Sequence, residues 1–351
     1  MTGRPGFLRG TPELVDYCLV PPMDALSDVL RAIRLSGAVY LNGEFSAPWC
    51  MQGSGDEALC SAFLPGSRRV VSYHLICEGS CWAQLASGKG PVLALSAGEI
   101  LVVPQGETHL LGSTRDMLET APTTLTAEEV DEASGQILKL SSDGAGEKTR
   151  MVCGFLACDE VLSNPLLAAL PRLFKVNLRS GRASAWLESS VLFAVEEAAA
   201  ARAGSTTVLA KLSELMFVEA VRRCIDTLPE NEKSWLAGLR DRFVGRALSL
   251  LHAQPAHAWT VEELARKVGL SRSALAQRFG EFVGHPPMQY LARWRLQIAA
   301  QQLRLGEKSL AAVAEHVGYD SEAAFNRAFK REFGMPPASW RRSENANLRT
   351  A

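Results

Sequence analysis

The fold of this chain is decided by a stretch that reads Val268-Gly269-Leu270-Ser271-Arg272-Ser273-Ala274-Leu275-Ala276-Gln277-Arg278-Phe279 and recurs as Val317-Gly318-Tyr319-Asp320-Ser321-Glu322-Ala323-Ala324-Phe325-Asn326-Arg327-Ala328-Phe329. Downstream of one inserted residue at Tyr319-Asp320, the two copies lie 50 positions apart. This register aligns Ser271 with Ser321, Leu275 with Phe325, Phe279 with Phe329, Gly284 with Gly334, Pro286-Pro287 with Pro336-Pro337, and Tyr290 with Trp340. A duplication of this length indicates a repeated supersecondary unit.

The first copy carries the signals of two helices joined by a tight turn. Thr260 is followed three residues later by a glutamate, which is the spacing of a capping box at a helix start. Gly269 suits the turn, because glycine adopts the left-handed conformation at little cost. Ser271 then caps a second helix that buries Leu275 and Phe279. The pattern predicts a helix-turn-helix unit, whose second helix enters the DNA major groove by its N-terminal half.

The second copy repeats the same signals. Ser309 and Ser321 are the expected helix caps, and Gly318 is the expected turn. Phe325 and Phe329 are expected to face inward. A long helix over residues 288–304 is predicted to join the copies through the apolar positions Leu291, Trp294, Leu296, Ile298 and Leu303.

The charge is distributed unevenly along the 351 residues. Residues 240–351 hold 17 Lys+Arg and 10 Asp+Glu, a balance of +7. Residues 1–239 therefore hold 37 − 17 = 20 basic and 38 − 10 = 28 acidic side chains, a balance of −8. This asymmetry indicates that the C-terminal part alone meets a polyanion. No leader pattern and no apolar run of membrane-spanning length is present, so we expect a cytoplasmic protein without a membrane partner.

The N-terminal part is predicted to be rich in β-structure. A helix capped by Asp24 is expected over residues 24–33. Short strands are expected over residues 38–41, 70–77, 81–85, 92–95, 100–103 and 151–157, and a polar loop over 113–148. Short strands at this spacing favour an antiparallel sandwich or small barrel.

Helical periodicity follows in residues 165–170, 185–202 and 205–228. The last of these predicted helices has an apolar stripe of Val208, Leu212, Leu215, Val218, Val221 and Ile225. This stripe fits either a homodimer interface or packing on the sheet domain, and the sequence leaves both open.

The second copy resembles the signature of the AraC/XylS family of transcription regulators. The match is Gly318-Tyr319-x-Ser321-x-x-x-Phe325-x-Arg327-x-Phe329-Lys330 followed by Phe333-Gly334-Met335-Pro336-Pro337. The resemblance implies a seven-helix domain whose two units enter successive major grooves of double-stranded DNA. By position, it implies base reading by Ser273, Gln277, Ala323 and Arg327, phosphate contacts by Arg272, Arg278 and Lys330, and further contacts by Glu322 and Asn326.

Two N-terminal stretches resemble the cupin barrel found in part of that family. They are the strand-turn-strand Tyr73-His74-Leu75-Ile76-Cys77-Glu78-Gly79-Ser80-Cys81-Trp82 and the run from Gly98 to His109 with the spacing Gly-x5-Pro-x-Gly-x2-His. The resemblance implies a sensor barrel that holds a small-molecule effector. The paired histidines of catalytic cupins are missing, so no cofactor is expected, and a metal at His74 and His109 is kept as an alternative.

Cys77 and Cys81 suggest a second kind of signal. In a hairpin with the loop Glu78-Gly79-Ser80 they would be cross-strand neighbours, with Cβ atoms about 4.5–5.5 Å apart. A thiol or redox sensor is therefore one hypothesis, and inert buried cysteines are the other. The expected sensor positions are His74, Cys77, Cys81, Trp82 and His109.

These observations predict an α+β protein of several domains. Residues 1–160 form a cupin-like antiparallel barrel, 161–233 a helical linker or dimerisation segment, and 234–342 an all-α domain with two helix-turn-helix units. The predicted function is a sequence-specific DNA-binding regulator, expected to be an activator that works with RNA polymerase and answers a small molecule or a thiol signal. The alternative is a metal-dependent cupin enzyme fused to a DNA-tethering domain.

Overall fold

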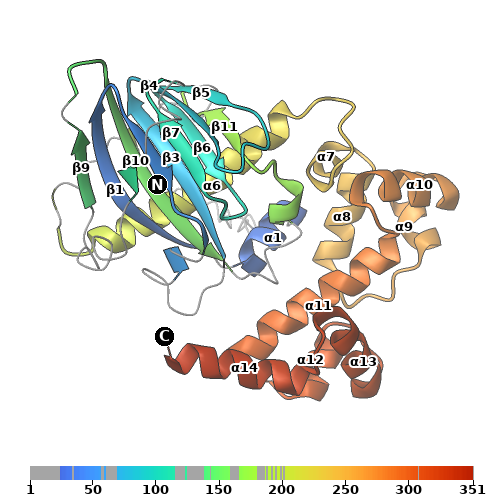
Figure 1. The fold of residues 1–351 in the computed structure, drawn as a ribbon. Helices are drawn as coiled ribbons and strands as arrows, with labels where there is room; N and C mark the ends of the chain where they lie inside the picture. The colour runs from blue at the N-terminus through green and yellow to red at the C-terminus, as the bar shows by residue number, and fades with distance from the viewer. Residues whose placement is uncertain are drawn as a thin grey trace, which may run out of the picture.

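The computed structural model describes residues 24–33, 35–56, 59–60, 69–114, 123–124, 138–142, 144–158, 166–179, 202–306 and 308–350, with single residues between 186 and 200. Predictions for residues 1–23 and for much of the segment 113–148 lie outside this part of the chain. Figure 1 shows a β-sheet domain, a helical domain, and a first helix that lies between them.

The N-terminal domain contains two facing sheets. The six-stranded sheet has the order β11-β6-β3-β10-β1-β9, and the five-stranded sheet has the order β5-β4-β7-β2-β8. The strand bounds are β1 Ser36–Ser46, β2 Cys50–Gly53, β3 Arg69–Glu78, β4 Ser80–Leu85, β5 Leu93–Ser96, β6 Glu99–Val103, β7 His109–Gly112, β8 Thr123–Thr124, β9 Leu138–Ser142, β10 Lys148–Cys158 and β11 Phe174–Asn177. A core that includes Leu41, Ile76, Met151 and Leu111 fills the space between the sheets.

The pairing confirms the predicted antiparallel sandwich, apart from two parallel pairs, β1–β9 and β2–β8. Strand β9 lies where a loop was expected, so that part of the prediction was wrong. Strand β11 pairs with β6 and therefore extends the sheet domain past the predicted boundary at residue 160. Both strands are short and add to sheet edges, where the alternation that marks a half-buried strand is weak.

Within the described residues, two helices, α6 and α1, lie next to the sheet domain. Helix α6, Ser205–Thr227, packs on the outer face of the large sheet through Leu209, Met216, Phe217 and Ala220. The approach is close: a Cβ on Gly37 of β1 would lie 2.6 Å from the Ala210 carbonyl oxygen. Helix α1, Ala25–Ile33, packs instead against the helical domain, and the Asp24 carboxylate caps it by accepting from the Ser27 amide at 2.8 Å.

The C-terminal domain is helical. Its bounds are α7 Trp235–Arg240, α8 Val244–Ala253, α9 Val261–Val268, α10 Arg272–Val283, α11 Pro287–Leu305, α12 Leu310–His316, α13 Glu322–Phe333 and α14 Pro337–Thr350. Within the described residues this is one helix more than the resemblance implied, because the short α7 precedes the rest. The predicted boundary at residue 233 falls between α6 and α7.

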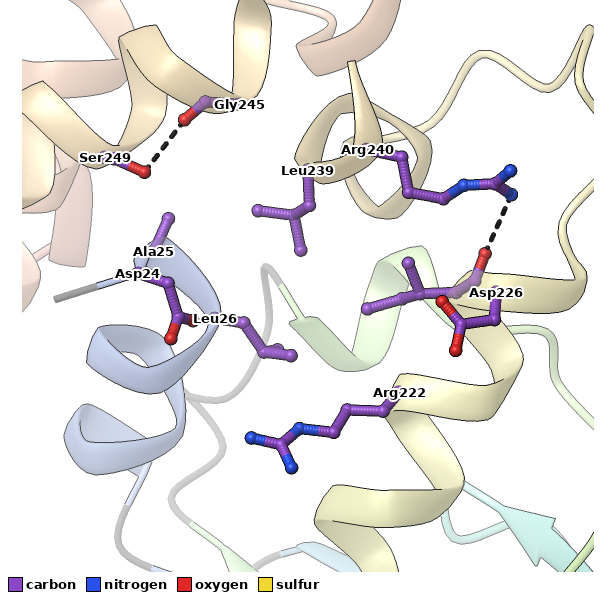
Figure 2. A pocket seen from close by; sticks show the side chains of 10 residues that line it. Asp24, Ala25, Leu26, Arg222, Asp226, Leu239, Arg240, Gly245 and Ser249 are labelled. Atoms are coloured by element: carbon purple, nitrogen blue, oxygen red, sulfur yellow. Dashed lines mark hydrogen bonds between the residues drawn. The ribbon is translucent and has the colours of Figure 1, made fainter. Parts of the chain in front are cut away.

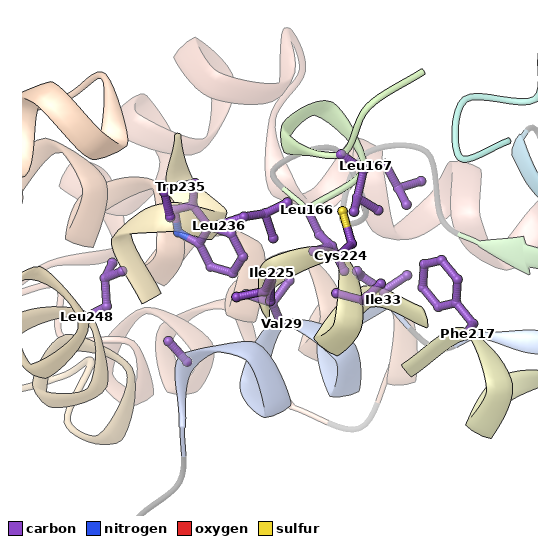
Figure 3. Close-up of a cluster of buried hydrophobic side chains, with 14 of the residues drawn as sticks. Val29, Ile33, Leu166, Leu167, Phe217, Cys224, Ile225, Trp235, Leu236 and Leu248 are labelled. Carbon is purple, nitrogen blue, oxygen red and sulfur yellow. The ribbon is translucent and has the colours of Figure 1, made fainter. Parts of the chain in front are cut away.

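The buried apolar side chains show how the domains are joined. One cluster runs from the sheet domain through α1 and α6 into α7, α8, α9, α10 and the first half of α11. Figure 3 shows its centre, where Val29 and Ile33 of α1 lie near Cys224 and Ile225 of α6 and Leu236 of α7. A separate cluster holds α12, α13 and α14 against the second half of α11. The first helix-turn-helix unit therefore shares its core with the sheet domain, and the second has its own.

No helix in the described part of the chain is long and apolar enough to cross a membrane.

Candidate functional site

The two helix-turn-helix units form as the sequence predicts. Four hydroxyls cap four helices, each accepting from a backbone amide three residues on: Thr260 from Glu263 at 3.1 Å, and Ser271, Ser309 and Ser321 from Ala274, Ala312 and Ala324 at 3.2 Å. Gly269 and Gly318 both adopt a φ of +83° at the turns. The caps and turns confirm where each second helix begins.

Each second helix turns a polar face outward. On α10, Leu275 and Phe279 are fully buried, whereas Arg272, Ser273 and Gln277 are exposed. On α13, Phe325 and Phe329 are fully buried. The outward side chains of α13 are Glu322, Ala323, Arg327 and Lys330, and Asn326 is half-buried beside them. The predicted DNA-facing residues thus gather on one exposed face of each helix.

Two of these side chains already have partners on the protein surface. Arg272 forms an ion pair with Glu262 of α9, with an N–O distance of 2.9 Å, and both side chains are largely exposed. Gln277 donates through Nε2 to Glu281 at 3.0 Å. Exposed pairs of this kind contribute little to stability, so phosphate or base atoms can replace these partners at small cost.

Arg278 is held differently from the other predicted contacts. Its Nε donates to both carboxylate oxygens of Asp241 at 3.1 and 3.0 Å, and its guanidinium lies 5.7 Å from the ring centre of Phe243. Burial alone would raise the pKa of Asp241, but the bonds from Arg278 and from the Val244 amide hold that pKa below its ordinary value. The pair uses Nε and one terminal nitrogen of Arg278 and ties α10 to the start of α8, so the geometry favours a structural role.

The predicted sensor histidines form a closed hydrogen-bond chain inside the barrel. His109 Nδ1 lies 2.8 Å from the Glu107 carbonyl oxygen and must donate to it, so its Nε2 is an acceptor. His74 Nε2 then donates to His109 Nε2 at 2.6 Å, and His74 Nδ1 accepts from the Cys153 thiol at 2.8 Å. Burial lowers the pKa of both imidazoles, which agrees with the two neutral rings that this chain requires.

This chain does not suit a metal ion. Each imidazole lone pair accepts a hydrogen bond from a neighbour, so neither ring has a free lone pair to offer a metal ion. Among the described residues, no group of three His, Cys, Asp or Glu side chains is arranged to hold a metal. In this arrangement the pair fits a satisfied core.

The predicted hairpin that would pair Cys77 with Cys81 is wrong. Strand β3 belongs to the large sheet and β4 to the small one, and the two do not pair with each other. Gly79, with a φ of +75°, turns the chain from one sheet to the next. Both cysteines are free thiols, and burial raises the pKa of Cys77 and raises that of Cys81 to about 12. Because the thiolate is the reactive form, these are poorly reactive cysteines.

Trp82 of β4 is buried in the same domain. A Cβ on Gly112 of β7 would lie 2.8 Å from its ring, so the strand opposite needs a glycine there. Trp82 therefore packs within the sheet.

A buried polar chain crosses the boundary between the domains. Trp235 Nε1 donates to the Tyr290 hydroxyl at 3.1 Å, and that hydroxyl lies 2.8 Å from His252 Nε2. The hydroxyl accepts from Trp235 and has its own proton to donate to Nε2, an arrangement that places the imidazole proton on Nδ1. This Nδ1 faces Asp28 Oδ2 of α1 at 3.7 Å, and both atoms are buried without a hydrogen-bond partner.

Burial acts on both charged groups of this junction. It lowers the pKa of His252 to about 3 and raises that of Asp28. The His252 ring also stacks on Trp294 of α11, with ring centres 4.1 Å apart. Asp28 therefore meets a neutral imidazole, and helix α1 rests on the helical domain through a poorly satisfied polar contact.

A cavity of about 390 Å³ opens beside this junction. Its wall is shared by four helices from both domains: Asp24, Ala25 and Leu26 of α1, Arg222, Ile225 and Asp226 of α6, Leu239 and Arg240 at α7, and Gly245 and Ser249 of α8. In Figure 2, Arg222 and Asp226 extend from α6 on one side, opposite Leu26 of α1 and Leu239 of α7. Arg240 is already engaged, because it donates to the Ile225 and Leu228 carbonyl oxygens at the end of α6.

Similarity to known proteins agrees with both halves of this architecture. A family model described as Cupin matches residues 24–226, and one described as Helix-turn-helix domain matches residues 264–343. A putative AraC-like transcription regulator of Streptomyces lividans is 31% identical over 91% of this chain and 98% of its own length. The chain belongs to the AraC-like transcription regulators.

Two further relatives of this AraC-like regulator match along nearly their whole length. The HTH-type transcriptional regulator AlkR of Acinetobacter baylyi is 28% identical over 91% of this chain and 99% of its own. The RCS-specific HTH-type transcriptional activator RclR of Escherichia coli is 29% identical over 91% of this chain and 97% of its own. The protein is thus a DNA-binding transcription regulator with a cupin-like N-terminal domain, and its relatives are named as regulators.

Several functional candidates in this AraC-like regulator were not found from the sequence. Cys153 completes the histidine chain but lies 79 positions from His74. His252 and Asp28 meet only through the fold of both domains. Neither set follows a motif or a regular spacing along the chain. Only information on which residues lie close together in space could have found them.

Proposed function

We propose that this regulator reads two successive major grooves on one face of the duplex, with α10 in one and α13 in the other. Ser273, Gln277, Ala323 and Arg327 are the proposed base-facing positions. Arginine pairs well with guanine and glutamine with adenine in the major groove, so Arg327 and Gln277 carry most of the direct readout. The observation that supports this most strongly is the matched geometry of the two units, with buried Leu or Phe beneath each outward polar face.

The remaining predicted contacts are assigned by chemistry. Arg272 and Lys330 are proposed to bind phosphates, which position the protein without reading sequence. Glu322 and Asn326 border the readout face of α13. Arg278 is left out, because its pairing with Asp241 supports a structural role.

We also propose that the protein is a cytoplasmic activator that contacts RNA polymerase and answers a small-molecule effector. The relative RclR is named an activator. The raised thiol pKa values argue against Cys77 and Cys81 as the sensor. A small molecule in the cavity between α1, α6, α7 and α8 would touch both domains at once, and its volume lies within the range of ligand pockets.

Selection of DNA tests the two-groove proposal. The full chain would be used to enrich duplexes from a random library, and guanine N7 methylation would then map the bound major groove. We expect two protected patches centred about 10 base pairs apart on one face. A single patch, or no enrichment above the input library, would contradict the proposal.

A further inference from the structure

The two helix-turn-helix units have separate cores that meet inside one helix. Tyr290, Leu291 and Trp294, in the first half of α11, belong to the core of the first unit. Leu296, Ala299, Ala300 and Leu303, in the second half, belong to the core of the second unit. Arg295 lies between these two sets, at the point where the helix passes from one core to the other.

The Arg295 guanidinium binds both units at once. Its Nε donates to the Pro255 carbonyl oxygen at 2.6 Å, and one terminal nitrogen donates to that of His257 at 2.8 Å. Both carbonyls belong to the loop between α8 and α9 that leads into the first unit. The other terminal nitrogen donates to the Gly318 carbonyl oxygen at 3.1 Å, and Gly318 is the turn of the second unit. One side chain therefore holds the loop of one unit against the turn of the other.

The turn and the loop are in direct contact at the same place. A Cβ added to Gly318 would lie 2.7 Å from the Ala256 carbonyl oxygen and 2.8 Å from its Cα. The corresponding turn in the first unit, at Gly269, has the same φ of +83° but no atom within 4 Å of such a Cβ. Gly318 thus has a second reason to be glycine, which is the approach of the loop 254–259.

Arginine suits this joint for chemical reasons. Its planar fork offers five donors in fixed directions and stays charged, whereas a lysine ammonium is a single point that cannot reach three separated carbonyls. Arg293, one position before Trp294, gives a contrast on the same helix. It lies within hydrogen-bond distance of the His285 ring and bridges to Glu332 of α13 at 3.5 Å, so its partners are side chains, and both side chains of the ion pair are substantially exposed. An exposed pair of this kind contributes little.

We propose that Arg295 is a positioning residue that fixes the distance and rotation between α10 and α13, and thereby sets the half-site spacing that the protein accepts. The inference rests on the proposed reading of two grooves. Inserting one base pair moves the second half-site by about 3.4 Å and turns it by about 35°. Two units that Arg295 holds rigidly cannot adjust to the displaced half-site. Without the Arg295 contacts, only α11 connects the units, and it can bend and twist so that the second unit reaches that half-site.

Binding to spacing variants tests this role. The probe is the duplex that the wild-type chain selects, together with duplexes in which one base pair is added or removed between the half-sites, and a duplex with the first half-site alone. For the wild-type chain, we expect either change in spacing to weaken binding by about tenfold or more, since contacts of the second unit are lost. For Arg295→Ala we expect weaker binding at the selected spacing. Adding or removing one base pair should then change its affinity by less than about threefold. Its binding to the single half-site should be unchanged.

Control variants separate positioning from charge and from folding. Arg293→Ala removes the same charge from the same helix and should keep the wild-type spacing profile. Arg295→Lys keeps the charge and should behave like Arg295→Ala. Circular dichroism melting would verify that every variant is folded at the assay temperature.

A glycine pair tests the same joint from its other side. Gly318→Ala should flatten the spacing profile, because its Cβ pushes the turn away from Ala256. Gly269→Ala carries the same conformational strain without the contact, so it should lower stability but leave the spacing profile steep.

The outcomes distinguish the two proposals. If the wild-type chain selects no two-half-site duplex, the proposed function fails. If it does, but Arg295→Ala keeps a steep spacing profile or weakens the single half-site equally, the positioning role is wrong.

Discussion

Arg327 and Arg331 lie one turn apart on α13 and are both exposed, yet they are expected to behave differently. Arg327 is in the half of the helix that enters the groove, and Arg331 is in its last turn. We expect Arg327→Ala to cost about 1–3 kcal/mol at one base pair and to relax the preference there. Arg331→Ala, which removes the same charge, should weaken all sequences slightly and uniformly.

Measured affinities for a set of single-base-pair operator variants would separate these effects. The base-reading role of Arg327 is refuted if its substitution weakens every sequence by the same factor. Salt titration adds a check. A variant that has lost one phosphate contact should show a slope of log K against log salt concentration that is smaller in magnitude by about one.

Among single residues, the sequence predicted the features that depend on residues nearby in the chain. The caps at Ser271 and Ser321 and the turn at Gly318 follow from local spacing, and the structure has them all. The structural roles of Arg278 and Arg295 were not predicted. Both residues lie on helices, and their partners are 37 and up to 40 positions away in the sequence. An arginine that binds distant backbone carbonyls has the same local sequence as one that faces water.

Helix α6 buries part of its apolar stripe on the sheet domain and leaves the rest exposed. Val221 and Ile225 are buried, as packing on the sheet domain requires, while Val208 and Leu215 are 37% and 42% exposed. Trp186 and Phe193, in the helical residues before α6, are also exposed, at 49% and 42%. Large apolar side chains exposed on neighbouring segments favour an interface, and we propose that a second copy of the chain covers them.

Charge placed on this exposed face should separate the copies. We expect the double variant Val208→Glu, Leu215→Glu to be a monomer at concentrations where the wild-type chain is a dimer, because two carboxylates would have to be buried on association. Thr207→Glu, at an exposed polar position of the same helix, is the matched control and should remain dimeric. Sedimentation velocity measures both, and a wild-type chain that is monomeric throughout would end the dimer proposal.

At the scale of elements, the hairpin error has a clear cause. Strands β3 and β4 are joined by Gly79 alone, which resembles a tight hairpin in sequence. Alternation predicts a strand but not its partner, and a short connection can equally pass from one sheet to another. Strand β3 is buried on both faces, since α6 covers one and the small sheet the other. A central strand of this kind is less regular in sequence than a half-buried one.

Across the whole molecule, the contact between Asp28 and His252 should make the joint between the domains sensitive to acid. Burial holds the pKa of His252 at about 3, against an ordinary value near 6.5. Above about pH 6.5 the ring is neutral both in the docked, folded state and in the unfolded chain. As pH falls below that value, only the unfolded chain takes up the proton, so folding loses up to about 1.4 kcal/mol per pH unit.

Other charged groups face the same junction and modify this effect. Asp24 opposes the lowered pKa of His252, and Arg31 opposes the raised pKa of Asp28. As its raised pKa is approached, Asp28 binds a proton in the docked state and offsets part of the loss. The loss of stability is therefore expected between about pH 6.5 and the lower pH at which Asp28 becomes protonated in the docked state.

The double variant Asp28→Leu, His252→Leu tests this directly. Apolar side chains of similar size remove the two buried atoms that lack a hydrogen-bond partner, but they also leave the Tyr290 hydroxyl without His252 Nε2. The test therefore rests on the pH dependence and not on the stability at neutral pH. The thermal midpoint of the double variant should fall less than that of the wild-type chain between about pH 7.5 and 5.5. His74 and His109 are present in both proteins, so their contribution cancels in the difference. Equal pH dependence in the two proteins would show that the junction does not respond to protons.

The separate core of the second helix-turn-helix unit has a consequence for how the protein moves on DNA. Its side chains contact one another around the end of α11, whereas the first unit is part of the core that continues into the sensor. A block with its own core can open and close cooperatively while its neighbour stays folded. The second unit can thus release the DNA while the first stays bound. The protein then searches the duplex by partial release and rebinding as well as by complete dissociation.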